Sequence, residues 1–110
     1  MSITETETID FATIDNVTGD LWLSIADHLP WDDDERSHLL LLQDKLNAYL
    51  RFIESGELFR KLPQAVGRRI VVDLGGKFQL SEQAQVFFET ARAAIEDAGF
   101  ALQFRLINPN

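Results

Sequence analysis

The chain has 110 residues, of which 45% are hydrophobic, with no cysteine and a formal net charge of −8. This length suits one globular domain with a single core. The absence of cysteine excludes disulfides, a thiolate nucleophile and a cysteine-based metal site. An acidic chain is repelled by nucleic acid and by an anionic membrane surface, so neither is an expected partner.

The negative charge is concentrated at the front of the chain. The first 35 residues hold ten carboxylates and no Lys or Arg, whereas the remainder holds eight acidic and ten basic side chains. The acidic part ends in the run Trp31-Asp32-Asp33-Asp34-Glu35, immediately before a leucine-rich segment. This asymmetry is the strongest indication in the sequence of what the protein binds.

Residues 1–8 alternate Thr and Glu without apolar periodicity, which predicts a disordered tail ahead of a single domain over residues 9–110. Met1 to Asp10 has neither a basic n-region nor an apolar h-region, so no signal peptide is expected. No stretch approaches the roughly 20 apolar residues of a spanning helix. The expected location is therefore the cytoplasm.

Two strands are predicted next, over residues 9–15 and 21–26, joined by the turn residues 16–19, Asn-Val-Thr-Gly. In the second strand, Leu21, Leu23 and Ile25 share one face, and Trp22 lies on the other.

A long helix is predicted from Asp32 to about Ser55, with Gly56 ending it. Asp32 and Glu35 are spaced as in a capping box, in which each side chain reaches the other residue's amide. The apolar residues recur three and four apart, as on one helical face. The inward stripe is Leu39, Leu42, Leu46, Tyr49, Leu50 and Ile53.

The second half of the chain alternates strands and helices. The predicted elements are a connector over 57–67 with a helical turn near Leu58-Phe59, a strand over 69–74, a bend or bulge at Gly75-Gly76, a resumed strand over 77–80, a helix over 81–98 capped by Ser81 and Gly99, and a strand over 100–106.

The resulting order is ββαβαβ. One-sided strands and one-sided helices predict an α+β two-layer sandwich, with a four-stranded sheet and both helices on one face.

The acidic run from Trp31 to Glu35 allows several interpretations. Carboxylates at a helix start are explained by capping and by the helix dipole. As an exposed surface, the same residues predict a non-enzymatic interaction domain that binds a basic protein partner. A metal site on Asp34 and His38, four apart on one helical face, is the weaker alternative. No cofactor is predicted.

An enzyme is the rival class. A metal-dependent or hydrolytic site would be built on Asp27, His28, Asp34 and His38, which lie within twelve residues of one another. The chain holds no G-x-S-x-G, H-E-x-x-H or P-loop motif, and a Ser, a His and an Asp in one sequence do not make a triad without the right geometry. No catalytic residue is therefore assigned.

Two further surfaces are suggested. Arg60, Lys61, Arg68 and Arg69 make the connector basic, which either solvates a loop or marks an anion or acidic-partner site. Apolar residues on the sheet face away from the helices, Trp22, Val71 and Ile107, predict a homodimer interface.

Several segments together resemble a family of small bacterial proteins known only as a domain of unknown function. The most specific is the helical block from His38 to Leu50. The others are residues 9–11, 23–29, 31 and 52–56. The resemblance implies a small single-domain cytoplasmic bacterial protein and carries over no catalytic residue, cofactor or substrate.

Overall fold

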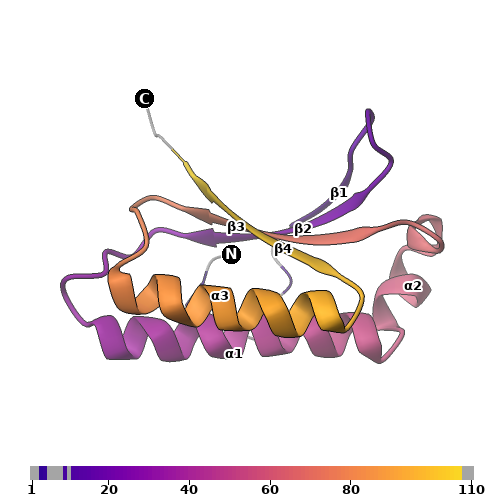
Figure 1. Ribbon diagram of the computed structural model, residues 1–110. Helices are drawn as coiled ribbons and strands as arrows, with labels where there is room; N and C mark the ends of the chain where they lie inside the picture. The colour runs from indigo at the N-terminus through magenta and orange to yellow at the C-terminus, as the bar shows by residue number, and fades with distance from the viewer. Residues whose placement is uncertain (1–2, 5–8, 10, 108–110) are drawn as a thin grey trace.

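The computed structural model describes residues 3–4, 9 and 11–107. In this part of the chain, a four-stranded sheet in the order β1-β2-β3-β4 lies over two long helices (Figure 1). The elements are β1 (Phe11–Ile14), β2 (Leu21–Asp27), α1 (Glu35–Glu54), α2 (Glu57–Lys61), the 3-10 turn η1 (Pro63–Ala65), β3 (Ile70–Gly76), α3 (Glu82–Asp97) and β4 (Ala101–Leu106).

The first two strands form an antiparallel hairpin, in which Ile14 pairs with Leu21. The Asp15 carboxylate closes the turn by accepting from the Val17 amide at 2.7 Å. Gly19 adopts a φ of 80°, which a side chain would disfavour. The predicted hairpin is therefore present, with its turn closed by Asp15 and Gly19.

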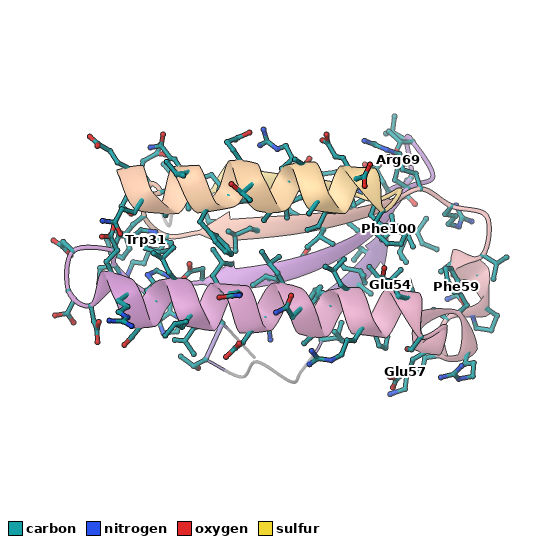
Figure 2. The ribbon with its side chains drawn as sticks, turned by 60° about the horizontal axis from the view of Figure 1, so that its bottom comes forward. Trp31, Glu54, Glu57, Phe59, Arg69 and Phe100 are labelled. Carbon is teal, nitrogen blue, oxygen red and sulfur yellow. The ribbon has the colours of Figure 1, made fainter. Side chains whose placement is uncertain are left out.

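Strands β2, β3 and β4 are parallel, and α1 and α3 make the two crossovers between them. Both helices lie side by side under the same face of the sheet, as Figures 1 and 2 show. The predicted α+β two-layer sandwich is confirmed. Because each crossover returns the chain to the start of the next strand, the carboxyl ends of β2, β3 and β4 meet at the end of the molecule where α1 and α3 begin.

The core lies between the sheet and the helices. Leu42, Leu46, Tyr49 and Ile53 of α1 are buried there, as their spacing predicted. The remaining core residues come mainly from the strands and from α3: Leu21, Leu23, Ile25, Ile70, Val72, Leu74, Ala84, Phe88, Ile95 and Leu102.

Two polar residues of α1, His38 and Lys45, are also buried, which the apolar pattern did not indicate. The Lys45 Nζ lies 5.7 Å from the centre of the Tyr49 ring, and the Tyr49 hydroxyl donates to the Ser24 carbonyl at 2.6 Å. This polar layer joins α1 to the middle of β2.

The predicted bulge at Gly75-Gly76 and the resumed strand over 77–80 are wrong. Both glycines lie within β3 in regular register, with Gly75 opposite Ala26 and Arg105. A Cβ on Gly75 would come 2.5 Å from Ile107 Cδ1, and one on Gly76 would come 2.7 Å from Phe104 Cε1. Close side-chain packing, stricter at Gly76 than at Gly75, therefore accounts for the glycines without a bend.

The predicted disordered tail falls largely on residues 1–2 and 5–8, which lie outside the described residues. Ile3 is fully buried in the core cluster, and its amide donates to the Ala26 carbonyl at 3.0 Å. Ile3 thus anchors the front of the chain beside β2. No helix in the described ranges has the length and apolar character needed to cross a bilayer.

Candidate functional site

The turn between β2 and α1 is organised by a buried pair of polar side chains. Asp27 is the last residue of β2, and His38 lies in the first turns of α1. His38 Nε2 and Asp27 Oδ2 are 2.6 Å apart, and both side chains are almost completely buried. The other carboxylate oxygen of Asp27 accepts from the Leu29 amide at 3.1 Å.

The second ring nitrogen of His38 is occupied as well. Nδ1 lies 3.1 Å from the Pro30 carbonyl oxygen. A carbonyl can only accept, so Nδ1 donates to it. The contact between Nε2 and Asp27 then needs one more proton, carried either by the imidazole or by the carboxyl group. The ring is thereby fixed at both nitrogens, and it ties β2, the loop and α1 together.

Trp31 completes this arrangement by stacking on the histidine ring. The two ring centres are 3.5 Å apart with an interplanar angle of 12°, and Trp31 is only 7% exposed. Figure 2 shows Trp31 at the end of the molecule where α1 begins. Trp31, proposed from the sequence as a binding residue, therefore packs within the fold and supports the turn rather than presenting itself to a partner.

The helix begins two residues later than predicted. Asp34, not Asp32, is the N-cap of α1, and its carboxylate accepts from the Ser37 amide at 3.3 Å. The predicted capping box between Asp32 and Glu35 is wrong. Each of three consecutive Asp residues could cap a helix, and the sequence alone does not distinguish among them.

The acidic turn, defined as Asp32, Asp33, Asp34 and Glu35, is consequently the exposed part of this structure. The three Asp residues are exposed and Glu35 is half-buried. In the described part of the chain, Asp32 and Asp33 have no hydrogen-bond or ion-pair partner. The buried residues Asp27, Trp31 and His38 stabilise the turn, while the carboxylates of Asp32 and Asp33 face solvent.

The structure places the four residues proposed for a metal or hydrolytic site around two separate hollows, and in the described part of the chain the one side-chain hydrogen bond among them joins Asp27 to His38. Asp27 and His38 are in contact, whereas Asp34 caps α1 and His28 is exposed. His28 and Asp27 line a hollow of about 310 Å³ with Lys77 and Ile107, while His38 and Asp34 line a different hollow of about 100 Å³.

The contacts of His38 also oppose both enzymatic roles. A metal ligand needs a free ring nitrogen, and a catalytic triad needs one that faces a nucleophile. Here one nitrogen meets Asp27 and the other meets the Pro30 carbonyl. Among the described residues, no group of three or more His, Asp and Glu side chains is placed to hold a metal ion. The pair is organised as a structural tie.

The open face of the sheet differs from the apolar surface expected there. Trp22 and Val71 are neighbours in register, but Val71 is only 2% exposed. The Trp22 indole nitrogen is buried without a hydrogen-bond partner among the described residues. Val71 therefore offers almost no surface to a second chain, whereas Trp22 is half-buried.

A polar cluster occupies the middle of that face instead. Asp73 is buried, and Arg105 Nη2 approaches its Oδ2 to 2.7 Å while Gln103 donates to its Oδ1 at 2.9 Å. The hydrogen bonds and charge of Asp73 raise the pKa of Arg105 above its ordinary value. The sequence alone did not indicate this cluster. Asp73 on β3, and Gln103 and Arg105 on β4, all lie at positions that face away from the helices.

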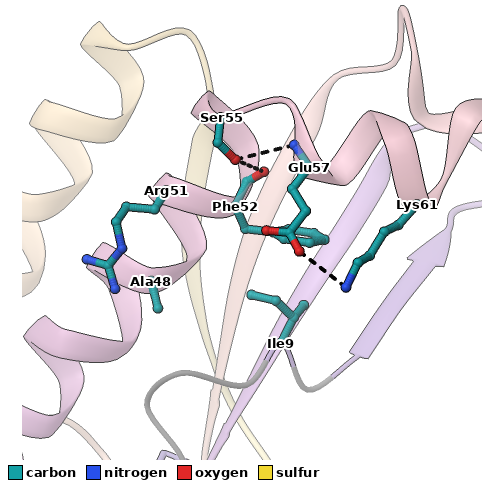
Figure 3. A pocket seen from close by; sticks show the side chains of 7 residues that line it. All are labelled: Ile9, Ala48, Arg51, Phe52, Ser55, Glu57 and Lys61. Carbon is teal, nitrogen blue, oxygen red and sulfur yellow. Dashed lines mark hydrogen bonds and ion pairs between the residues drawn. The ribbon is translucent and has the colours of Figure 1, made fainter.

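The basic residues of the connector mostly stabilise local structure. Arg68 donates to the carbonyls of Gln64 and Gly19, and Arg69 pairs with Asp20 at 3.3 Å. Lys61 pairs with Glu57 at 3.2 Å beside an open cavity of about 710 Å³ (Figure 3). That cavity is lined by Ile9, Ala48, Arg51, Phe52, Ser55, Glu57 and Lys61. Its paired charges and open shape indicate no particular ligand.

Comparison with known proteins gives a family for this chain. A family model matches residues 1–108. The chain belongs to DUF6572, a family of unknown function. No curated protein and no solved structure matched the chain. Membership of DUF6572 confirms the predicted family type and carries no activity with it, so the function of this DUF6572 domain must be inferred from its geometry.

Proposed function

We propose that this DUF6572 domain is a non-enzymatic protein-interaction domain, and that its acidic turn is the surface that binds a basic protein. The observation that carries the proposal is the buried tie beneath the turn. Asp27 and Trp31 are both buried in contact with His38, and the side chains of Asp32 and Asp33 nearby are exposed.

The tie supports binding because it orders the turn in advance. When a loop becomes ordered only on binding, the entropy that it loses reduces the free energy of binding. Here Pro30 accepts from His38, Trp31 is stacked, and Asp34 is held by its capping bond. The backbone of the turn is therefore fixed before a partner arrives.

Charge supports the same conclusion. Arg36 offsets only one of the four negative charges of the acidic turn. Two of these carboxylates are unpaired in the described structure, so they are available to Lys or Arg side chains of another protein. Clustered charge of one sign mainly speeds the encounter with a partner of the opposite sign. We also expect the domain to act in the bacterial cytoplasm.

A pair of charge-matched variants tests the proposal. Asp32→Asn with Asp33→Asn removes two charges from the turn, while Glu96→Gln with Asp97→Asn removes two from the exposed end of α3. Proteins cross-linked to each variant in cells would be quantified by mass spectrometry. We expect a basic protein that is bound by the wild type and by the α3 variant but lost with the turn variant.

Binding of that protein, once purified, should weaken steeply with salt, because exposed charges are screened beyond about 10 Å at 0.1 M ionic strength. Equal capture by the two variants, or a partner whose binding is indifferent to salt, would contradict the proposal.

A further inference from the structure

The hydrogen bonds of the Asp27–His38 pair require a proton that the two residues would not hold apart from each other at neutral pH. His38 Nδ1 has to donate, because its partner is the Pro30 carbonyl oxygen at 3.1 Å. Nε2 and Asp27 Oδ2 lie 2.6 Å apart, and one of these two atoms has to carry a proton as well. A neutral imidazole and an ionised carboxylate hold one proton between them, whereas this geometry uses two.

Loss of the second proton would leave two acceptors facing each other in the interior. If the remaining proton stays on Nδ1, the lone pair of Nε2 points at the Asp27 carboxylate. If it moves to Nε2, the lone pair of Nδ1 points at the Pro30 carbonyl instead. The side chains of His38 and Asp27 are only 2% and 3% exposed, so water does not compensate either contact. The pair is therefore fully hydrogen-bonded only while it holds the second proton.

Charged groups on the neighbouring elements act on the pair more weakly. They are Asp33, Asp34 and His28 in the loop, Lys45 two turns along α1, Lys77 after β3 and Glu82 at the start of α3. All of these side chains except Lys45 are exposed, so solvent and salt screen their charges. Lys45 Nζ lies near the Tyr49 ring, further along the helix. In the described part of the chain, Asp27 is the one ionisable side chain hydrogen-bonded to the His38 ring.

We infer that the Asp27–His38 pair is a proton-linked switch, which couples the order of the acidic turn to pH. A histidine in an unfolded chain loses its proton at about pH 6.5, whereas the folded pair keeps a proton to complete its hydrogen bonds. Above that pH, the folded state binds more protons than the unfolded chain. The stability that the pair contributes is thus complete below about pH 6.5 and falls as pH rises, until the folded pair gives up its proton.

The switch would regulate the binding proposed above, and this part of the inference rests on the proposed function. His38 stacks on Trp31 and holds the Pro30 carbonyl, so loss of the proton loosens the loop that carries Asp32 and Asp33. A basic partner would then meet an ordered turn at or below neutral pH and a less ordered one above it. The test uses the domain alone, so the switch and the proposed function can fail separately.

The variant Asp27→Asn separates the hydrogen bonds from the proton. An Asn amide can donate to a neutral Nε2 while its oxygen accepts from the Leu29 amide, so the contacts remain without an ionisable partner. Urea denaturation between about pH 6 and about pH 9 compares Asp27→Asn with the parent chain, both carrying His28→Gln to remove the other histidine. In the parent, we expect the equilibrium constant of unfolding to rise by up to about tenfold for each pH unit above about pH 7. In Asp27→Asn it should stay nearly constant.

The same pH dependence in both proteins would overturn the inference. The N-terminal amine also ionises in this range, but it is present in both chains and cancels in the comparison. A second measurement does not depend on the folding of Asp27→Asn. When the wild type refolds from urea at about pH 8 in weak buffer with an indicator dye, it should take up about one proton per chain. Refolding without proton uptake would equally overturn the inference.

Discussion

Asp27 and His38 are eleven residues apart in the chain, and their side chains meet at 2.6 Å between the end of β2 and the start of α1. The contact closes the loop that carries the acidic turn. Since His38 also donates to the Pro30 carbonyl and stacks on Trp31, one imidazole ring connects three separate points of that loop. The stability of the domain and the shape of its exposed carboxylates therefore depend on the same residue.

His38→Ala should destabilise the domain by about 3–5 kcal/mol, because removing one partner leaves a buried carboxylate without compensation. Urea denaturation followed by tryptophan fluorescence measures the change. His28→Ala is the matched control, and its exposed side chain predicts a change within about 0.5 kcal/mol. Similar costs for the two substitutions would show that the Asp27 contact contributes little.

Asp34→Ala should cost about 0.5–2 kcal/mol, the usual effect of losing an N-cap. Asp32→Ala removes the same group from the same turn without breaking a hydrogen bond, so it should change stability far less. Denaturation midpoints of both variants decide between the two positions. A larger loss of stability in Asp32→Ala than in Asp34→Ala would indicate that Asp32 is the N-cap.

Gly76→Ala should destabilise the domain by about 1–3 kcal/mol, the usual cost of overpacking a filled core. Gly75→Ala should cost less. At Gly76 the new Cβ meets the Phe104 ring and the Phe78 carbonyl, whereas at Gly75 it meets the end of the flexible Ile107 side chain. Adding Ile107→Ala should therefore reduce the cost of Gly75→Ala and leave that of Gly76→Ala unchanged. Thermal unfolding of these four variants and of Ile107→Ala alone gives this comparison.

Arg105→Gln should cost about 1–3 kcal/mol, because Asp73 would remain buried with only Gln103 to satisfy it. The pKa of Arg105 is raised by Asp73, so its stabilising effect is complete below the ordinary arginine pKa and is lost only as pH rises through the still higher folded value. The cost should thus be the same at about pH 7 and about pH 9.

The surface pair of Arg92 and Glu89 provides the comparison for that experiment. Exposed ion pairs contribute about 0–1 kcal/mol, so Arg92→Gln should have a small effect. Equal losses of stability in Arg92→Gln and Arg105→Gln would mean that water can replace Arg105 as a hydrogen-bond partner of Asp73 at no net cost.

Elements specified by local chemistry were predictable from the sequence. The hairpin turn is marked by Gly19, which takes a φ of 80°. Ser81 caps α3 by accepting from the Ala84 amide, and Gly99 follows the helix at a φ of 97°. In each case the deciding residues lie within a few positions of the element that they start or end.

Features decided by distant contacts were not predictable in the same way. Gly75 and Gly76 suggest a bulge when read locally, but Ile107 and Phe104 of a neighbouring strand determine their place. Asp27 and His38 were named from the sequence only as part of a possible metal or hydrolytic site with His28 and Asp34. No local pattern shows that they would pair with each other, because the loop between them has to fold first.

The residues that stabilise the acidic turn are different from the residues that form its exposed surface. His38 stabilises the turn, and Asp32 and Asp33 form the surface. Asp32 and Asp33 make no bond within the described structure, so exchanging their side chains alters the outer surface without removing a supporting contact. Substitutions at these two positions should therefore change the charge of the outer surface, whereas substitutions at Asp27 or His38 should change the loop that carries it.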